Sequence, residues 1–171
     1  RGPACADPGL TAGIEGIYLR DVQAGTTEIV SVLDRSSCGD PALASNEPSG
    51  NPEVTQAGEL VFFDSAASLT ADDRDGVSDV YAYDPATCRV LNLSAGLNAP
   101  ASDPASSDDG RFVAFESGID PQIAVLDRTT GVLLPLGAGR DPSLSADGSQ
   151  LVYTADVGGV SQVFLVSLAG G

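Results

Sequence analysis

The sequence contains no histidine and no lysine in 171 residues. Without histidine, neither a Ser-His-Asp nor a Cys-His catalytic arrangement can be built from this chain, and histidine-ligated zinc or iron sites are excluded. Without lysine there is no Schiff-base nucleophile and no phosphate-loop lysine. Only carboxylate chemistry or a metal site made of oxygen ligands remains, so we expect no catalytic residue in this chain.

Long apolar runs are lacking too. No stretch reaches the ~18 apolar residues of a membrane-spanning helix, and the first residues lack both a starting Met and the apolar part of a signal peptide. We therefore expect the sequence to begin inside a longer protein. The net charge of −16, from 24 acidic residues against eight arginines, disfavours nucleic acid and anionic membrane surfaces as partners.

A repeat organises the rest of the chain. Segments that begin at Pro52, Pro104 and Pro142 each reach a glycine six residues later, and an aromatic residue follows five residues after that glycine. The residues between glycine and aromatic are mostly apolar. A short segment, a glycine turn and an apolar stretch predict a β-hairpin.

A second element occurs four times, at residues 17–21, 80–84, 123–127 and 163–167. A glycine, or Cys88 in one copy, stands four residues after the end of each, and apolar strands are expected at 29–33, 90–93 and 132–136. The first three copies end in Asp21, Asp84 and Asp127. Because a catalytic group is needed only once, this recurrence indicates that the three carboxylates stabilise turns.

The two hairpins together give a unit of four short strands. The unit repeats after 43 residues between Asp84 and Asp127, and after 38 between Pro104 and Pro142. This predicts an all-β fold of β-propeller blades, each with four antiparallel strands. The alternative, an up-and-down sandwich, does not explain the Asp-Gly turns at fixed offsets.

Three to four blades are expected, as part of a larger propeller. Residues 1–12 are assigned to an N-terminal segment and residues 13–171 to blades. These comprise a partial blade up to residue 33, a linker at 34–51, blades at 52–95 and 101–137, and a partial blade at 141–171. Since a propeller closes by pairing strands from both ends, further blades are expected outside this sequence, or another copy supplies the missing strands.

The turn sequences resemble those of the TolB-like propeller repeats, whose blades carry a Pro-x-x-Ser-x-Asp-Gly turn before an apolar strand. Ser145-Ala-Asp147-Gly148 and Ser107-Asp-Asp109-Gly110 fit this pattern, whereas Gln56-Ala-Gly58 lacks the Asp. The resemblance covers roughly residues 13–171. It implies the fold, and it leaves function open because such propellers serve as binding platforms and as appended domains.

The loop at residues 71–79 carries the strongest chemical signal. Carboxylates at alternate positions, followed by a glycine, can surround Ca²⁺ with oxygen ligands. Asp73, Asp75 and Asp79 would supply side chains and Val77 its carbonyl, but Ala71 occupies the first ligand position and the distal Glu is absent. The alternative is a turn in which the Asp carboxylates accept backbone N–H groups.

Three cysteines fit an exported protein with one disulfide and one further thiol. We expect Cys5 to pair with Cys38, because both lie in loops predicted to emerge on one propeller face. Cys88, at a turn predicted on the other face, would be free or would pair outside this sequence. The alternative is three unreactive thiols.

These features predict a non-catalytic propeller module that is extracellular, on the cell surface or periplasmic. Its expected partner is another protein or copies of itself, with no nucleic acid and no membrane insertion. Calcium is the one cofactor that the sequence suggests. The alternative is a propeller domain attached to a hydrolase whose catalytic residues lie elsewhere, or a calcium-dependent carbohydrate-active enzyme.

Overall fold

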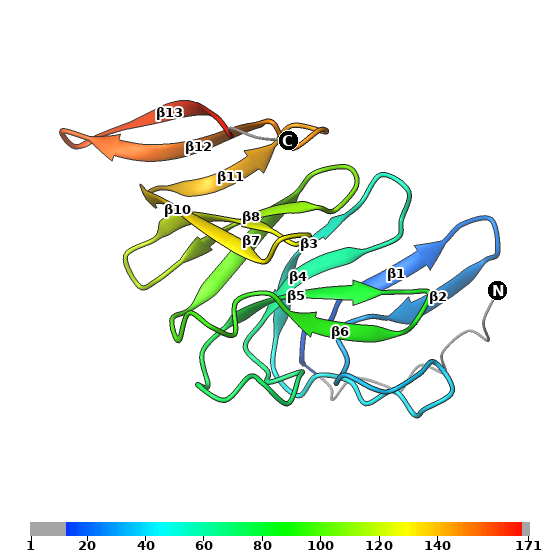
Figure 1. Ribbon diagram of the computed structural model, residues 1–171. Helices are drawn as coiled ribbons and strands as arrows, with labels where there is room; N and C mark the ends of the chain where they lie inside the picture. The colour runs from blue at the N-terminus through cyan, green and yellow to red at the C-terminus, as the bar shows by residue number, and fades with distance from the viewer. Residues whose placement is uncertain (1–12, 169–171) are drawn as a thin grey trace.

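The computed structural model describes residues 13–168, and all regular structure within them is β. The strands form antiparallel sheets that follow one another along the molecule (Figure 1). No helix in the described part of the chain is long and apolar enough to cross a membrane. The predicted all-β fold of propeller blades is therefore confirmed.

Four sheets contain these strands. The first joins β1 (Tyr18–Asp21) and β2 (Thr26–Ile29). The second contains β3 (Ser49–Val54), β4 (Val61–Ser65), β5 (Asp79–Asp84) and β6 (Arg89–Asn92). The third contains β7 (Ala101–Ser106), β8 (Phe112–Ser117), β9 (Gln122–Asp127) and β10 (Val132–Ala138). The fourth has β11 (Arg140–Leu144), β12 (Gln150–Val157) and β13 (Val160–Ser167).

Strands that are consecutive in sequence are neighbours in each sheet, as in a propeller blade. The first pair of strands in each of the three later sheets has a register shift. Each shift contains a residue with φ near 50° that directly precedes a proline, namely Asn51, Asp103 and Asp141. Asn and Asp tolerate this left-handed conformation, which bends the strand as a bulge does.

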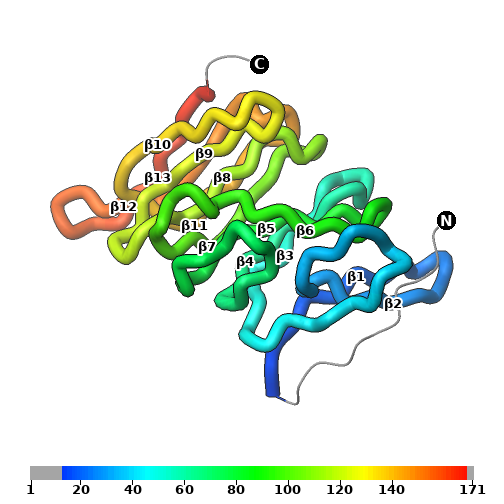
Figure 2. The backbone as a smooth tube through the Cα atoms, turned by 60° about the horizontal axis from the view of Figure 1, so that its bottom comes forward, coloured from blue at the N-terminus to red at the C-terminus, as the bar shows by residue number. Residues whose placement is uncertain are grey.

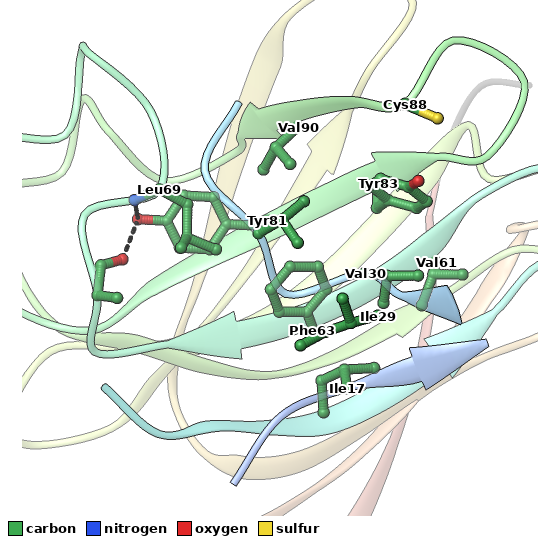
Figure 3. Close-up of a cluster of buried hydrophobic side chains, with 12 residues drawn as sticks. Ile17, Ile29, Val30, Val61, Phe63, Leu69, Tyr81, Tyr83, Cys88 and Val90 are labelled. Atoms are coloured by element: carbon green, nitrogen blue, oxygen red, sulfur yellow. Dashed lines mark hydrogen bonds between the residues drawn. The ribbon is translucent and has the colours of Figure 1, made fainter. Parts of the chain in front are cut away.

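The hydrophobic core lies between the sheets. Buried side chains form one cluster at each of the three boundaries between neighbouring sheets. Figure 3 shows the first of these, in which Phe63, Tyr81 and Tyr83 face Ile17 and Val30. The first and last sheets lie at opposite ends of the row of sheets (Figure 2).

The last strand of the first sheet differs from its prediction. It was expected at residues 29–33, but β2 is Thr26–Ile29 and pairs with β1 from Asp21↔Thr26 to Tyr18↔Ile29. The turn sets this register, because Oδ1 of Asp21 accepts the N–H groups of Gln23 and Ala24. The chain beyond Ile29 turns to the linker instead, where Val32 forms a bridge with Ala44.

Candidate functional site

The loop between β4 and β5 brings three carboxylates together. Asp73, Asp75 and Asp79 each offer one oxygen, and these oxygens lie within 4.8 Å of one another. Asp79 and Asp73 are only 1% and 7% exposed, whereas Asp75 is exposed. The N–H of Val77 donates to Oδ1 of Asp75 at 3.2 Å. The three side chains expected to bind calcium are thus neighbours, while a role for the Val77 carbonyl stays a prediction.

Asp79 is held by the last residue of β6 and by a serine two residues beyond it. The Ser94 hydroxyl donates to its Oδ1, and the Asn92 side-chain amide donates to its Oδ2 at 2.9 Å. Burial raises the pKa of Asp79, these two hydrogen bonds lower it, and the negative charges of Asp73 and Asp75 raise it further, so that the net shift is upward. The charged form of Asp79 is therefore disfavoured by its surroundings, and a bound cation would reverse that effect.

Asp73 is held by a tyrosine from β5. The Tyr81 hydroxyl donates to Oδ2 of Asp73. The same hydroxyl lies 3.0 Å from the Ala67 carbonyl and accepts the N–H of Leu69 at 3.4 Å (Figure 3). Burial, followed by the contact with Asp73, raises the pKa of Tyr81 above its ordinary value, so the hydroxyl keeps its proton. Oδ1 of Asp73 is also buried, and it has no hydrogen-bond partner among the described residues.

A second acidic group, not expected from the sequence, lies where the third and fourth sheets meet. Oxygens of Asp103, Glu116 and Asp141 lie within 4.8 Å of one another. Oε1 of Glu116 accepts the N–H of Asp141 at 2.9 Å, and Oδ2 of Asp64 accepts the N–H of Asp103 at 3.0 Å. Burial, and then the charges of Glu116, Asp141 and Asp64, raise the pKa of Asp103. These carboxylates link the second strand of one blade to the first strand of the next.

The repeat does contain a signal for this second group. Asp64 and Glu116 both stand six residues after a turn glycine, and Asp103 and Asp141 both stand directly before a proline. Equivalent positions in successive blades lie close together around a propeller. An alignment of the repeats that includes the acidic residues as well as the turn residues therefore predicts that these side chains lie close together.

A polar hollow of about 350 Å³ lies beside the second acidic group. Its lining includes Asp120, Asp141 and Asp156, together with Arg140. The buried polar atoms without a partner that occur in residues 13–168 do not belong to this lining.

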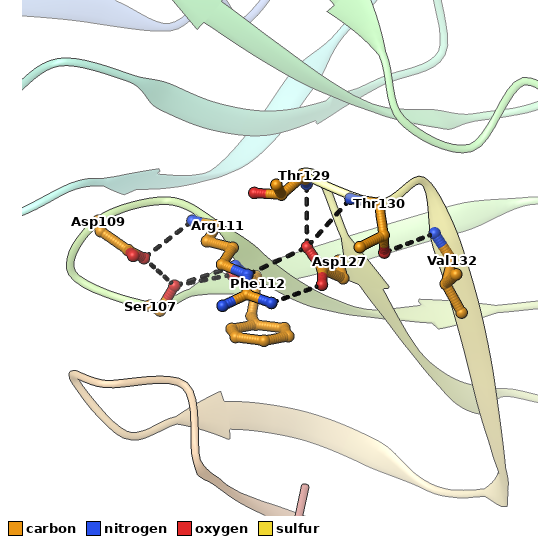
Figure 4. A network of polar contacts seen from close by, with 8 residues as sticks. All are labelled: Ser107, Asp109, Arg111, Phe112, Asp127, Thr129, Thr130 and Val132. Atoms are coloured by element: carbon orange, nitrogen blue, oxygen red, sulfur yellow. Dashed lines mark hydrogen bonds and ion pairs between the residues drawn. The ribbon is translucent and has the colours of Figure 1, made fainter. Parts of the chain in front are cut away.

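The repeated Asp residues stabilise turns, as predicted. Oδ1 of Asp127 accepts the N–H groups of Thr129 and Thr130, and Arg111 pairs with the same carboxylate (Figure 4). The hydrogen bond from Arg111 is the main reason why the pKa of Asp127 falls to about 2. Asp21 and Asp84 accept the equivalent backbone N–H groups in their own turns.

The disulfide joins Cys38 to Cys88, which are 50 residues apart. This pairing corrects the expected Cys5–Cys38 bridge, and Cys5 lies outside the described residues. The prediction assumed that Cys38 and Cys88 occupy opposite faces. The start of the linker instead runs beside the β5–β6 turn, where both oxygens of Asp34 accept hydrogen bonds from Arg89 at 2.8 Å.

The outer face of the fourth sheet is an apolar surface. Three positions of the repeat pack against the following blade in the second and third sheets, and their side chains are 4% exposed or less. In the second sheet they are Phe62, Val80 and Ala82, and in the third sheet they are Ala114, Ile123 and Val125. The equivalent residues of the fourth sheet, Val152, Val163 and Leu165, are 37%, 74% and 63% exposed. Among the described residues, β13 has no outer neighbour like β6 or β10. We call these three residues the open blade face.

Comparison with known proteins identifies the fold. No protein-family model and no curated protein sequence matches this chain. Among solved structures it is similar to TolB from Acinetobacter baumannii, with a TM-score of 0.58 and 24% identity over 91% of this chain and 36% of that one. It is also similar to an oligogalacturonate lyase in complex with manganese, with a TM-score of 0.61 and 16% identity over 96% of this chain and 44% of that one.

The putative TolB from Agrobacterium tumefaciens is similar too, with a TM-score of 0.56 and 18% identity over 84% of this chain and 47% of that one. The chain thus spans less than half the length of each of these three proteins. At these identities the likeness shows a TolB-like β-propeller fold. Both catalytic and non-catalytic proteins have this fold.

Proposed function

We propose that this chain is a non-catalytic, exported β-propeller module that binds protein, and that a further blade packs on its open blade face. The observation that carries the proposal is the exposure of Val152, Val163 and Leu165 at positions that are buried in both preceding sheets. The occupant is a blade of the same repeat, because a blade covers the equivalent positions at the other two boundaries.

The energetics favour an occupied face. Covering a side chain of the size of Val or Leu contributes about 1.5–3 kcal/mol, and Val163 and Leu165 are both more than half exposed. Among the described residues, the outer edge of β13 has no strand partner, and its backbone N–H and C=O groups are a template for strand pairing. A partner that supplies a packed face and an outer strand would satisfy both.

Three further observations support the rest of the proposal. The Cys38–Cys88 disulfide fits an oxidising compartment outside the cytoplasm, such as the periplasm or the cell surface. The lack of His and Lys removes the usual nucleophile and base pairs from this chain. Calcium enters the proposal as a ligand of the Asp73, Asp75 and Asp79 loop and has no catalytic role.

Light scattering of the purified chain, together with the native mass of the natural polypeptide, tests the proposal. Val163→Glu with Leu165→Glu should abolish any association of the 17.2 kDa chain, because two charges would be buried without partners. Val22→Glu with Ile119→Glu is the matched control, since these apolar residues are even more exposed but lie in turns. The control should associate as the unchanged chain does.

The native mass distinguishes whether the further blade belongs to the same polypeptide or to another copy of the chain. A natural polypeptide longer than 171 residues, with the open blade face protected from solvent, supports a blade on the same chain. A particle of several 17.2 kDa chains supports a blade shared between copies. A natural polypeptide that is a 17.2 kDa monomer would contradict the proposal in both forms.

A further inference from the structure

We infer that the loop between β4 and β5 is a binding site for a hard divalent cation, Ca²⁺ above all, with Asp73, Asp75 and Asp79 as its side-chain ligands. The inference deepens the cation-binding part of the proposed function and rests on it. Protein association through the open blade face is a separate property with a separate measurement, so the two can fail independently.

The first argument is the concentration of negative charge without an ion-pair partner. Asp73 and Asp79 are almost fully buried next to each other, and Asp75 adds a third carboxylate. The ion pairs observed within residues 13–168, Arg89–Asp34 and Arg111–Asp127, lie elsewhere. Buried carboxylates are costly unless a cation or hydrogen bonds compensate them. Arg74, in the same loop, is exposed and donates from Nε to the Ala71 carbonyl. No ion pair with the three carboxylates is observed within residues 13–168, so a bound cation would add the charge that compensates them.

The second argument is an unsatisfied oxygen. Oδ2 of Asp73 accepts from Tyr81, but Oδ1 of the same carboxylate is buried without a partner among the described residues. Buried polar atoms in folded proteins nearly always have a partner, so this atom calls for an explanation. A cation held among the three carboxylates would supply the missing partner.

The size and chemistry of the group indicate the class of ion. All three ligand atoms are carboxylate oxygens, which hard cations such as Ca²⁺ prefer over transition metals. Ca²⁺ binds oxygen at 2.3–2.6 Å, so its ligand shell is about 4.6–5.2 Å across. Oxygens that lie within 4.8 Å of one another fit around such an ion. The exposed Asp75 leaves one side open to water, which would complete the shell.

The buried ligands are also held in place by their neighbours. Ser94 and Asn92 orient Asp79, and Tyr81 orients Asp73. Such outer partners fix the direction of a metal ligand and contribute to affinity. Because Tyr81 and Asp79 belong to β5, in the interior of a four-stranded sheet, two of the three carboxylates are positioned by a rigid element.

Terbium luminescence provides the test. Tb³⁺ takes the same oxygen ligands as Ca²⁺ and emits when a nearby aromatic side chain absorbs. The chain has no Trp and four Tyr, and the Tyr81 hydroxyl contacts Asp73 directly. We expect saturable emission at one Tb³⁺ per chain, displaced by Ca²⁺ far more readily than by Mg²⁺. Asp73→Asn and Asp79→Asn should each weaken binding by more than about tenfold, the lower end of the loss for outer-shell partners.

Thermal unfolding separates lost binding from lost folding. Ca²⁺ should raise the midpoint of the unchanged protein, because a ligand of the native state stabilises it. Asp73→Asn should unfold at or above the normal midpoint in EDTA, since repulsion is relieved and its carbonyl can still accept from Tyr81, but it should show no rise with Ca²⁺. Asp79→Asn should also show no rise with Ca²⁺, and its own midpoint should fall because its buried NH2 group would face a donor, Ser94 or Asn92. Glu116→Gln, in the second acidic group, is the matched control and should keep both responses. Absence of Tyr-sensitised emission, or emission that survives both Asp variants, would overturn the inference.

Discussion

At Gly148, a single residue meets two demands at once. Its φ of +68° is the left-handed conformation that the Asp-Gly turn requires. A Cβ at this position would also lie 2.3 Å from Cδ2 of Phe112, in the neighbouring sheet. Gly110, one blade earlier, would place a Cβ 2.9 Å from both Leu60 and Thr55. The glycines of these two turns therefore set both the turn and the close approach of successive blades, whereas the equivalent Gly58 has no neighbour within 4 Å of a Cβ.

Replacing Gly148 by Ala should destabilise the protein more than replacing Gly131 by Ala. Both residues have φ near +70°, so each variant bears a conformational cost of about 1–2 kcal/mol. Only Gly148 has a neighbour within 4 Å of the new Cβ, and overpacking adds about 1–3 kcal/mol. Urea unfolding of the two variants measures the difference. Equal losses in the free energy of unfolding would show that the sheets near Phe112 can move apart to make room for the added methyl group.

The difference between local chain geometry and packing between blades also decides which site residues could be predicted from the sequence. Asp73, Asp75 and Asp79 lie within seven residues, so their proximity follows from local chain geometry, and the structure brings them together. Glu116 and Asp141 come from different sheets, and the backbone N–H of Asp141 donates to the Glu116 carboxylate. That proximity depends on how one blade packs against the next, so only a comparison of whole repeats, and no local pattern, could indicate it.

At the scale of elements, the strands of the repeat followed from its pattern and the linker did not. Glycine spacing and apolar runs predicted where blade strands occur, because each strand repeats the same burial and turn requirements. The segment after Ile29 has no counterpart in the other blades. Its path depends on single contacts, such as the pairing of Asp34 with Arg89. The disulfide partner of Cys38 was therefore predicted wrongly.

The Cys38–Cys88 disulfide should be a major source of stability, because it closes a loop of 50 residues and ties the linker to the second blade. In the chain-entropy account, such a loop contributes up to about 4 kcal/mol, and measured losses are about 2–5 kcal/mol. We expect Cys38→Ala to lower the free energy of unfolding by this amount. The measurement is denaturant unfolding with and without reductant.

Reductant provides the internal control for that prediction. It should lower the stability of the unchanged protein to that of Cys38→Ala, and it should leave the variant itself unaffected. If Cys38→Ala unfolded at the same denaturant concentration as the oxidised protein, the hydrogen bonds between Asp34 and Arg89 alone would suffice to hold the linker.

Across the whole molecule, the row of blades combines apolar packing between sheets with groups of acidic residues. Apolar side chains fill each boundary between sheets, and this row of cores continues as the open blade face. Six acidic residues within residues 13–168 form two groups of three, one in the β4–β5 loop and one on the second and first strands of successive blades. In the second group, packing between blades therefore has to overcome repulsion among carboxylates that the same packing brings together.

Stability should consequently rise with salt. The net charge is −16, and between 0.01 M and 1 M NaCl the Debye length falls from about 30 Å to about 3 Å. Salt screens the repulsion among the many negative charges and also weakens the attraction within ion pairs. Because only two ion pairs are observed within residues 13–168, the loss of repulsion is the larger effect. The thermal midpoint in EDTA should therefore increase with NaCl at pH 7.

Near pH 4, where ordinary carboxyl groups take up protons, the increase should shrink, although Asp127, with a pKa of about 2, stays charged. A midpoint that falls with salt at pH 7 would mean that the ion pairs of Arg89 and Arg111 outweigh the repulsion.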